Sequence, residues 1–285
     1  MTATQERTSR TGDKLSGRVA FVTGGTRGIG AAICRSMAAQ GADVAAGYSG
    51  NDEAAERFRK QFCDDFPDQG FSVHKGDISN ADDCRRTIAE VIDKHGRLDI
   101  LVNNAGITAD RTVLKMTDDD WRRVIDVNLS GAFYLSQAAL KHMLERGSGR
   151  IVMISSVIGE MGGIGQSNYS SAKAGLLGLT KTLAREAAMQ VQRSGKTDGL
   201  GITVNAVTPG YTATEMLETV PEKVLDNLKA KIPLGRLGEP EEIARVVHFL
   251  AADEGVTSEQ LTGNIEPNAA VKLAAFGLGA ELDLE

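Results

Sequence analysis

The 285-residue sequence has few cysteines and aromatic residues, and glycine or a charged residue interrupts every hydrophobic stretch. Its three cysteines form no CxxC pair, and an odd number fits a reducing compartment better than a disulfide framework. No hydrophobic stretch approaches the length of a membrane span. The polar first residues, Met1–Lys14, lack the apolar region of a secretory signal. We therefore expect a soluble, cytoplasmic protein without a membrane partner.

The sequence also lacks a large excess of charge of either sign. It has 32 Lys and Arg against 38 Asp and Glu, which gives a net charge of -6 and a pI near 5.4. This balance provides no general attraction to a polyphosphate backbone, so we expect no nucleic-acid partner. The histidines are scattered without ligand spacing, and no metal site is predicted. They are His74, His95, His142 and His248.

The order of apolar and amphipathic segments predicts the fold class. With 41% hydrophobic residues, the chain can bury a sizeable core as one domain. Short apolar segments alternate with longer amphipathic ones, which predicts an α/β fold with a doubly wound, mostly parallel sheet and helices on both faces. Thr117 with Asp120, Gly96 and Pro240 mark helix boundaries. The expected strands are Arg18–Val22, Asp43–Gly47, Phe71–Lys75, Ile100–Asn103, Arg150–Ile154 and Ile202–Ala206.

The ends of the chain and one internal segment depart from this pattern. We expect a disordered leader at residues 1–16, the folded domain at 17–268 and an atypical tail at 269–285. The polar, glycine-containing segment Gln190–Gly201 predicts a surface insertion between a helix and the next strand. Pro267 has no backbone N–H to donate to a neighbouring strand, so the sequence does not decide whether a last edge strand forms here.

A glycine-rich turn, Thr23-Gly24-Gly25-Thr26-Arg27-Gly28-Ile29-Gly30, follows the first predicted strand. Gly24, Gly28 and Gly30 allow the backbone to approach a pyrophosphate, and the following helix offers amide donors. Glycines also serve tight turns that bind nothing. The strand before the turn and the helix after it favour a dinucleotide site.

The residues after the second strand bear on the choice of cofactor. An NAD site usually has an acid there for the ribose 2′-hydroxyl, but this strand runs into Tyr48 and Ser49. Arg27, inside the glycine turn, can make a bidentate contact to a 2′-phosphate, although alone it could equally be a solvated loop charge. With no carboxylate at the strand end, we predict NADP(H) rather than NAD(H).

Two more strand ends carry candidate cofactor contacts at the carboxyl edge, where open α/β sheets bind ligands. Asp77 and Ile78 follow the third strand, and Asn104, Ala105 and Gly106 follow the fourth. Ordinary turn chemistry is the alternative, because turns favour Asp, Asn and Gly. Their position on one edge favours cofactor binding.

Tyr169, Lys173 and Ser156 are the candidate catalytic residues. Tyr169 and Lys173 are four residues apart, which places them on one helix face, and Ser156 follows a strand. Reduction of a ketone needs a proton donor and a hydrogen-bond donor for the developing oxyanion, roles that fit Tyr169 and Ser156. We expect Lys173, with the oxidised nicotinamide, to lower the pKa of Tyr169. The alternative is an amphipathic helix surface, but none of the other three tyrosines has a lysine at this offset.

These motifs resemble the short-chain dehydrogenase/reductase family. The matches are TGxxxGxG at Thr23–Gly30, NNAG at Asn103–Gly106 and YxxxK at Tyr169–Lys173, within a region from about Gly17 to Ala252. The resemblance implies a Rossmann fold in which Lys173 also binds the nicotinamide ribose and Asn128 holds a water relay to that lysine. It further implies that the nicotinamide and diphosphate are contacted by Pro209, Gly210, Thr212 and Thr214.

Several segments are similar to reductases of 3-oxoacyl thioesters, either acetoacetyl-CoA reductases or 3-oxoacyl-carrier-protein reductases. Asn51–Ala55 and Val220–Leu225 lean toward the CoA enzymes, which implies reduction of acetoacetyl-CoA to an (R)-3-hydroxyacyl thioester. Gln166 could donate a hydrogen bond to the acyl carbonyl, or it could be solvated. The resemblance implies a homo-oligomer, either a tetramer or a dimer, although the atypical C-terminus leaves assembly open.

Two other functions remain open at this point. Arg146, Arg193 and Lys196 lie near helix ends where carrier-dependent relatives place docking residues, so the thioester could be carried by an acyl-carrier protein. A dinucleotide sensor without turnover is the second alternative. The presence of all four catalytic candidates argues against a sensor.

Overall fold

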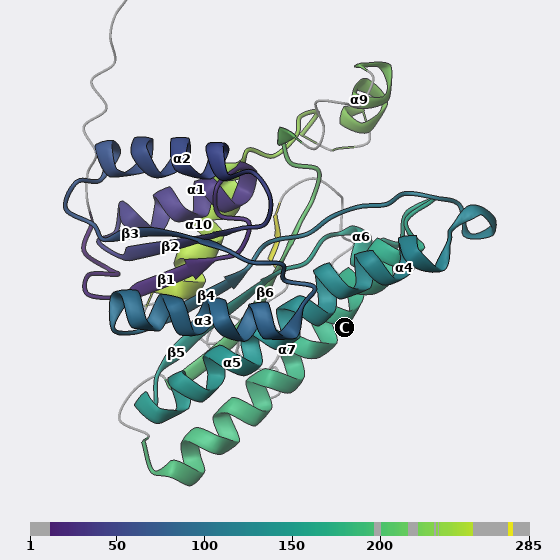
Figure 1. The fold of residues 1–285 in the computed structure, drawn as a ribbon. Coiled ribbons are helices and arrows are strands. Elements are labelled where there is room, and N and C mark those ends of the chain that lie inside the picture. The colour runs from purple at the N-terminus through teal and green to yellow at the C-terminus, as the bar shows by residue number, and fades with distance from the viewer. Residues whose placement is uncertain are drawn as a thin grey trace, which may run out of the picture.

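The computed structural model describes residues 12–196, 201–215, 222–230, 232, 234–252 and 273–275. Most of the predicted leader, part of the predicted insertion and most of the predicted tail lie outside the described residues. The strands form one seven-stranded sheet of order β3-β2-β1-β4-β5-β6-β7, and every pairing is parallel. The predicted α/β fold with a doubly wound sheet is confirmed (Figure 1).

The six predicted strands are all present. β3 and β4 have the predicted bounds, and β6 is three residues longer than predicted because the chain stays extended as far as Pro209. Side chains of β1, β4 and β5 are buried throughout, as expected where helices cover both faces of a parallel sheet. The strands are β1 Val19–Val22, β2 Asp43–Tyr48, β3 Phe71–Lys75, β4 Ile100–Asn103, β5 Gly149–Ile154, β6 Ile202–Pro209 and β7 Leu273–Ala275.

Helices cover the two faces of the sheet in separate layers (Figure 1). One layer consists of α1 Gly28–Ala38, α2 Asp52–Asp65 and α10 Pro240–Ala251. The other consists of α3 Ala81–His95, α5 Gly131–Arg146 and α7 Ser167–Ser194. The shorter elements are the 3-10 helix Val113–Lys115, α4 Asp118–Ile125, the π-helix Asp126–Ser130, α6 Ile158–Met161 and α9 Glu222–Lys229.

Each layer encloses its own hydrophobic core against the sheet. Ile33 and Met37 of α1 pack with Val247 of α10 on one face, whereas Leu135 of α5 and Leu176 of α7 pack on the other. Each such side chain contributes roughly 1.5–3 kcal/mol when fully buried. The two cores hold the sheet rigidly, so the carboxyl ends of its strands form a fixed platform.

The predicted helix boundaries are confirmed. Thr117 and Asp120 form a reciprocal capping box at the start of α4. Gly96 ends α3 at a φ of 76°, a conformation that costs glycine little, and Pro240 occupies the first turn of α10.

Two expectations about segment boundaries are wrong, and the structure answers a third point that the sequence left undecided. Residues 12–16 are not part of a disordered leader, because Leu15 is fully buried and Gly12 N–H donates to Ala39 O at 2.7 Å. Residues 190–194 of the predicted insertion continue α7. β7 lies inside the predicted tail and pairs with β6, beyond Pro267.

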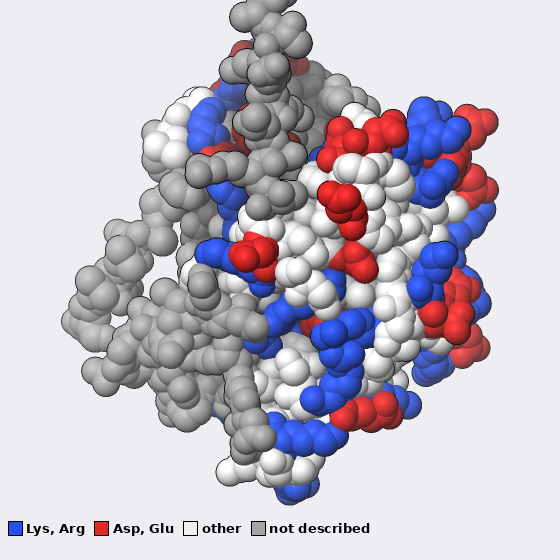
Figure 2. Space-filling view, turned by 90° about the vertical axis from the view of Figure 1, so that its left-hand side faces the viewer, with Lys and Arg blue, Asp and Glu red and all other residues white. Residues whose placement is uncertain are grey.

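Acidic and basic side chains are interspersed on the face at the left of Figure 1, as the space-filling view shows (Figure 2). On α3, for example, Arg86 pairs with both Asp83 and Glu90, at 2.9 and 2.7 Å. In the described part of the chain, no helix combines the length and the apolar character that a membrane span needs.

Candidate active site

The glycine turn between β1 and α1 forms a cradle that side chains would fill. Gly24 and Gly28 have φ values of 61° and 49°, which favour glycine. A Cβ on Gly30 would clash with Gly24 O and lie 2.7 Å from Asn104 Nδ2. The side chain of Ile29 packs against the core and anchors the turn, and the backbone of the glycines is left accessible to a ligand. This geometry fits a pyrophosphate at the N-terminus of α1.

Thr23 joins the glycine turn to the end of β4 by hydrogen bonds. Its Oγ1 accepts the backbone N–H groups of Asn104 at 2.9 Å and Ala105 at 3.0 Å. Asn104 returns a hydrogen bond from Nδ2 to Thr23 O at 2.8 Å. Two predicted cofactor segments, far apart in the sequence, are thus held side by side by short hydrogen bonds.

The expectation that no carboxylate stands at the end of β2 is wrong. Asp52, the first residue of α2, accepts a hydrogen bond from Lys75 Nζ at 2.9 Å and one from the Tyr48 hydroxyl. These hydrogen bonds, the one from Lys75 first, lower the pKa of Asp52. Burial and then the bond to Asp52 raise the pKa of Tyr48. Sequence reasoning missed Asp52 because α2 begins so soon after Ser49 that its first turn folds back to the strand end.

Arg27 begins α1 as its N-cap residue, and its guanidinium lies 3.6 Å from the Glu215 carboxylate. Both side chains are more than half exposed, at 76% and 57%. Exposed pairs of this kind contribute at most about 1 kcal/mol, so Arg27 can exchange Glu215 for a stronger anion.

The turn after β3 places Asp77 and Ile78 as predicted, at the carboxyl edge. The carboxylate of Asp77 accepts from Ser79 N at 2.9 Å and Ser79 Oγ at 2.7 Å, so it shapes the turn. Ile78 packs on the core below α5, and its carbonyl accepts from Cys84 Sγ at 3.2 Å.

Ser156 and Tyr169 come together after β5 and in the first turn of α7. Their hydroxyl groups lie close enough for Ser156 to lower the pKa of Tyr169. Ser156 is buried, and its Oγ also accepts from Ile158 N at 3.2 Å. Because the Ile158 amide occupies a lone pair of Ser156, the hydroxyl hydrogen of Ser156 is left to donate.

Lys173 lies one helical turn beyond Tyr169, with Nζ 5.6 Å from the centre of the phenol ring. The side chain is 3% exposed, and its Nζ donates to Ile154 O at 2.7 Å. An ammonium group has three donor hydrogens, so two remain for other partners. Burial lowers the pKa of Lys173 to about 8.

The protein's own groups raise the pKa of Tyr169, whereas the predicted fall depends also on the charge of the oxidised nicotinamide. Burial raises the pKa of this phenol, the hydroxyl of Ser156 acts in the opposite direction, and the Asp110 carboxylate raises it further. Tyr169 is therefore protonated at neutral pH, which is the form that donates a proton.

Asn128 lies in the π-helix between α4 and α5, a distortion common at functional sites. Its amide is buried and makes two hydrogen bonds to Ile107, accepting from N at 2.8 Å and donating to O at 2.9 Å. A Cβ on Gly106 would lie 3.2 Å from Asn128 Oδ1 and 3.5 Å from Lys173 Nζ. Gly106 thus leaves open the space that joins Asn128 to Lys173.

Two residues that sequence reasoning missed hold the loops around Tyr169. Asn168 is fully buried, and its Nδ2 donates to Ala109 O at 3.1 Å and Asp120 O at 3.0 Å. Asp110 accepts from Gln166 Nε2 at 3.2 Å. Gln166 comes shortly before Tyr169 in the chain, and its predicted contact with the acyl carbonyl stays a prediction. Its amide is engaged with Asp110, a contact that no local sequence signal indicates.

The segment after β6 closes the site from the side of the glycine turn. Pro209 O accepts from Val157 N at 3.1 Å, and Thr212 Oγ1 donates to Gly210 O at 3.2 Å. Thr214 Cγ2 would lie 3.6 Å from a Cβ on Gly28. The structure thus brings Thr214 to the glycine turn.

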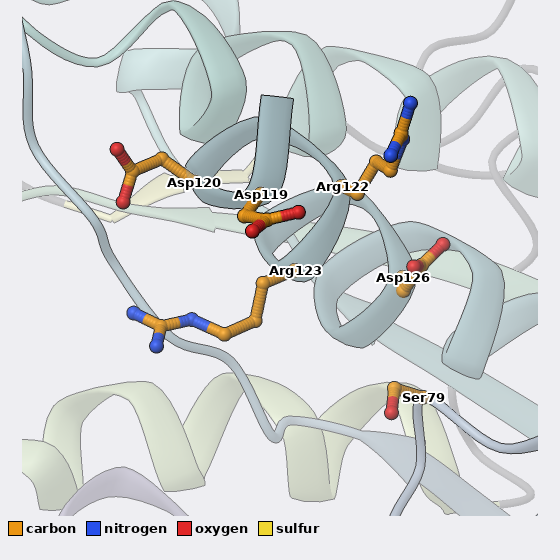
Figure 3. A pocket seen from close by; sticks show the side chains of 6 residues that line it. All are labelled: Ser79, Asp119, Asp120, Arg122, Arg123 and Asp126. Atoms are coloured by element: carbon orange, nitrogen blue, oxygen red, sulfur yellow. The ribbon is translucent and has the colours of Figure 1, made fainter. Parts of the chain in front are cut away.

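A pocket of about 360 Å³ lies beside α4 (Figure 3). It contains none of the predicted site residues. Its lining is polar and consists of Ser79, Asp119, Asp120, Arg122, Arg123 and Asp126. Within the described residues, no group of three or more His, Cys, Asp or Glu side chains could hold a metal ion.

Comparison with known proteins agrees with this geometry. The family model of the short chain dehydrogenases matches residues 18–225. The acetoacetyl-CoA reductase of Rhizobium meliloti (strain 1021) is 50% identical over 250 residues, covering 87% of this chain and 97% of that protein. The acetoacetyl-CoA reductase of Shinella zoogloeoides is 49% identical with the same coverage.

A carrier-protein reductase and a solved structure are also similar. The 3-oxoacyl-[acyl-carrier-protein] reductase FabG of Thermotoga maritima is 39% identical over 252 residues, covering 88% of this chain and 96% of that protein. A crystal structure described as a short-chain alcohol dehydrogenase from Sinorhizobium meliloti 1021 has a TM-score of 0.76 and 33% identity. It covers 84% of this chain and 91% of that one.

The chain belongs to the short-chain dehydrogenase family. It is an oxidoreductase with a nicotinamide dinucleotide as cofactor. The open glycine cradle at the N-terminus of α1 fits that cofactor.

Proposed function

We propose that the protein reduces a 3-oxoacyl thioester with NADPH, and that its substrate is acetoacetyl-CoA, which gives (R)-3-hydroxybutyryl-CoA. The observation that carries this proposal is the buried Lys173, whose Nζ lies 5.6 Å from the centre of the Tyr169 ring and donates to Ile154 O, two residues before the buried Ser156. The similarity to two acetoacetyl-CoA reductases at about half identical residues supports the choice of substrate. We also propose a cytoplasmic location. We propose self-association as well, which the partly exposed Trp121 on α4 and Phe133 on α5 support.

Tyr169 donates the proton in this proposal. When bound, the reduced nicotinamide supplies a hydride to the keto carbon, which leaves negative charge on the oxygen. Tyr169, protonated at neutral pH, gives its proton to that oxygen. Ser156 donates a hydrogen bond to the same oxygen, because its lone pair is already engaged by Ile158.

Lys173 and Asn128 support this donor. Lys173 is anchored by Ile154 O and offers its two remaining hydrogens to the nicotinamide ribose and to the path that returns a proton to Tyr169. Asn128 fixes Ile107 and with it the loop in front of Lys173. Gln166 contacts the acyl portion after exchanging its bond to Asp110.

The preference for NADPH rests on Arg27 in the glycine turn. Its weak pairing with Glu215 leaves the guanidinium available for a bidentate contact with a 2′-phosphate. The backbone and side chains of the glycine turn and strand ends form the remainder of the proposed cofactor site. They are Gly24, Gly28, Ile29, Gly30, Tyr48, Ser49, Asp77, Ile78, Asn104, Ala105, Gly106, Pro209, Gly210, Thr212 and Thr214.

A carrier-protein substrate is the second candidate, supported by the similarity to FabG of Thermotoga maritima. Of the proposed docking residues, Arg146 pairs with the buried Asp99 at 3.2 Å, and Lys196 donates to the carbonyls of Leu144 and Glu145. These contacts give both side chains structural roles, which favours the CoA thioester. A dinucleotide sensor without turnover is a weaker candidate, since Ser156, Tyr169, Lys173 and Asn128 are all assembled.

Steady-state oxidation of NADPH decides between these functions. We expect turnover with acetoacetyl-CoA to exceed that with the acetoacetyl carrier protein, and Tyr169→Phe to lower kcat by about 100-fold or more. Tyr134→Phe, on α5 and outside the proposed site, is the matched control and should leave kcat unchanged. A large preference for the carrier protein would establish the second candidate. Cofactor binding without oxidation on any 3-oxoacyl thioester would establish a sensor.

A further inference from the structure

The ends of β2 and β3 hold a cluster of three polar side chains, Tyr48, Asp52 and Lys75. Tyr48 and Lys75 are register partners in the sheet, and Gly76 N–H donates to Tyr48 O at 3.0 Å. Asn51 caps α2 by accepting from Ala54 N at 2.9 Å, which sets Asp52 at the start of the helix. Asp52 then accepts from Lys75 Nζ at 2.9 Å and from the Tyr48 hydroxyl.

This cluster lies next to the glycine turn. Gly25 N–H donates to Gly47 O at 3.0 Å, so the turn that carries Arg27 packs directly on the end of β2. Arg27 therefore lies on one side of that strand end, and Lys75, the last residue of the neighbouring strand β3, lies on the other. Each cation is paired with one carboxylate, Glu215 or Asp52.

The charges of the Arg27–Glu215 and Lys75–Asp52 pairs indicate which ligand could bind beside them. Lys75 and Asp52 are 53% and 63% exposed, so water screens their attraction and the pair can be exchanged for a stronger one. A phosphate monoester carries about 1.5 to 2 negative charges and binds cations more strongly than a carboxylate does. Without Lys75, the charge of Asp52 at the strand end would repel such a group.

We propose that Lys75 is a specificity-determining residue for the cofactor: it neutralises Asp52 and provides, with Arg27, the second cation for the 2′-phosphate of NADPH. This inference rests on the proposed function, because it assumes a nicotinamide dinucleotide on the glycine turn. It explains how a site with a carboxylate at the end of β2 accepts NADPH. Cofactor specificity is usually set by a residue at the end of the second strand, whereas Lys75 lies at the end of β3.

Calorimetric titration with 2′,5′-ADP and with 5′-AMP tests the proposal without turnover. Lys75→Met should raise the Kd for 2′,5′-ADP about tenfold, because a charge-assisted contact is lost, and should leave the Kd for 5′-AMP unchanged. Asp52→Asn combined with Lys75→Met should recover part of the affinity, because the uncompensated carboxylate is then removed. Lys60→Met removes an exposed charge from α2 and serves as the matched control.

Equal changes in both Kd values for Lys75→Met, or no change in either, would overturn the proposal. So would a double variant that binds 2′,5′-ADP no better than Lys75→Met alone. Reduction of acetoacetyl-CoA by the unaltered protein is measured separately. If that reduction proceeds while Lys75→Met keeps full preference for 2′,5′-ADP, the inference fails and the proposed function stands.

Discussion

Replacement of Lys173 by methionine should stabilise the protein while it abolishes turnover. Lys173 is 3% exposed, and burial lowers its pKa from 10.5 to about 8. At about 1.4 kcal/mol per pKa unit, keeping this amine protonated at pH 7 costs the folded state roughly 3 kcal/mol. Methionine avoids that cost but loses the hydrogen bond to Ile154 O, which contributes about 1 kcal/mol. The expected net gain is about 2 kcal/mol.

The pH dependence of this gain identifies its cause. The folded protein binds the proton of Lys173 less tightly than the unfolded chain does, so the wild type gains stability as pH rises from about 8 toward 10.5. The advantage of Lys173→Met should therefore be complete at pH 7 and disappear near pH 10. Lys181→Met, at an exposed position on the same helix, should show no such pattern.

Urea unfolding of the cofactor-free protein, followed by circular dichroism at several pH values, measures this difference. A gain of about 2 kcal/mol corresponds to a rise in Tm of about 4–8 °C for a domain of this size. A variant less stable than the wild type at pH 7 would refute the reasoning, because burial of a protonated amine would then cost little. A gain independent of pH would assign the effect to packing instead.

Three further predictions concern the loops and the histidines. Gly106→Ala should lower kcat about tenfold with little change in stability, because the added Cβ would crowd Asn128 and Lys173. An unchanged kcat would show that the reaction does not need the space between these two residues. Asn168→Ala should reduce the free energy of unfolding by about 2–3 kcal/mol in a urea titration, because two buried carbonyls lose their donor; a loss below about 0.5 kcal/mol would contradict this. Burial lowers the pKa of every histidine below 6.5, so the unfolded chain binds protons at a higher pH than the folded protein does. Tm should therefore fall as pH drops from 6.5 toward 5. A constant Tm over this range would refute the lowered pKa values. The histidines are His74, His95, His142 and His248.

The sequence by itself determined six of the seven strands, the glycine turn and the spacing of Tyr169 and Lys173. These features depend on local chemistry: a buried parallel strand needs a continuous apolar run, a close backbone approach needs glycine, and helix geometry sets which residues share a face. Such signals are complete within a few neighbouring residues. For this reason the predicted strand bounds differ by only a few residues from those observed.

Only the tertiary structure decided the charge environment of the site. The pKa of Tyr169 depends on its burial and on Asp110, and the end of β2 contains a carboxylate because α2 folds Asp52 back toward Lys75. Leu15 likewise belongs to the core although its neighbours in the sequence are polar. Solvation and Coulomb interactions depend on distances between segments far apart in the chain, and these distances exist only after the layers have packed.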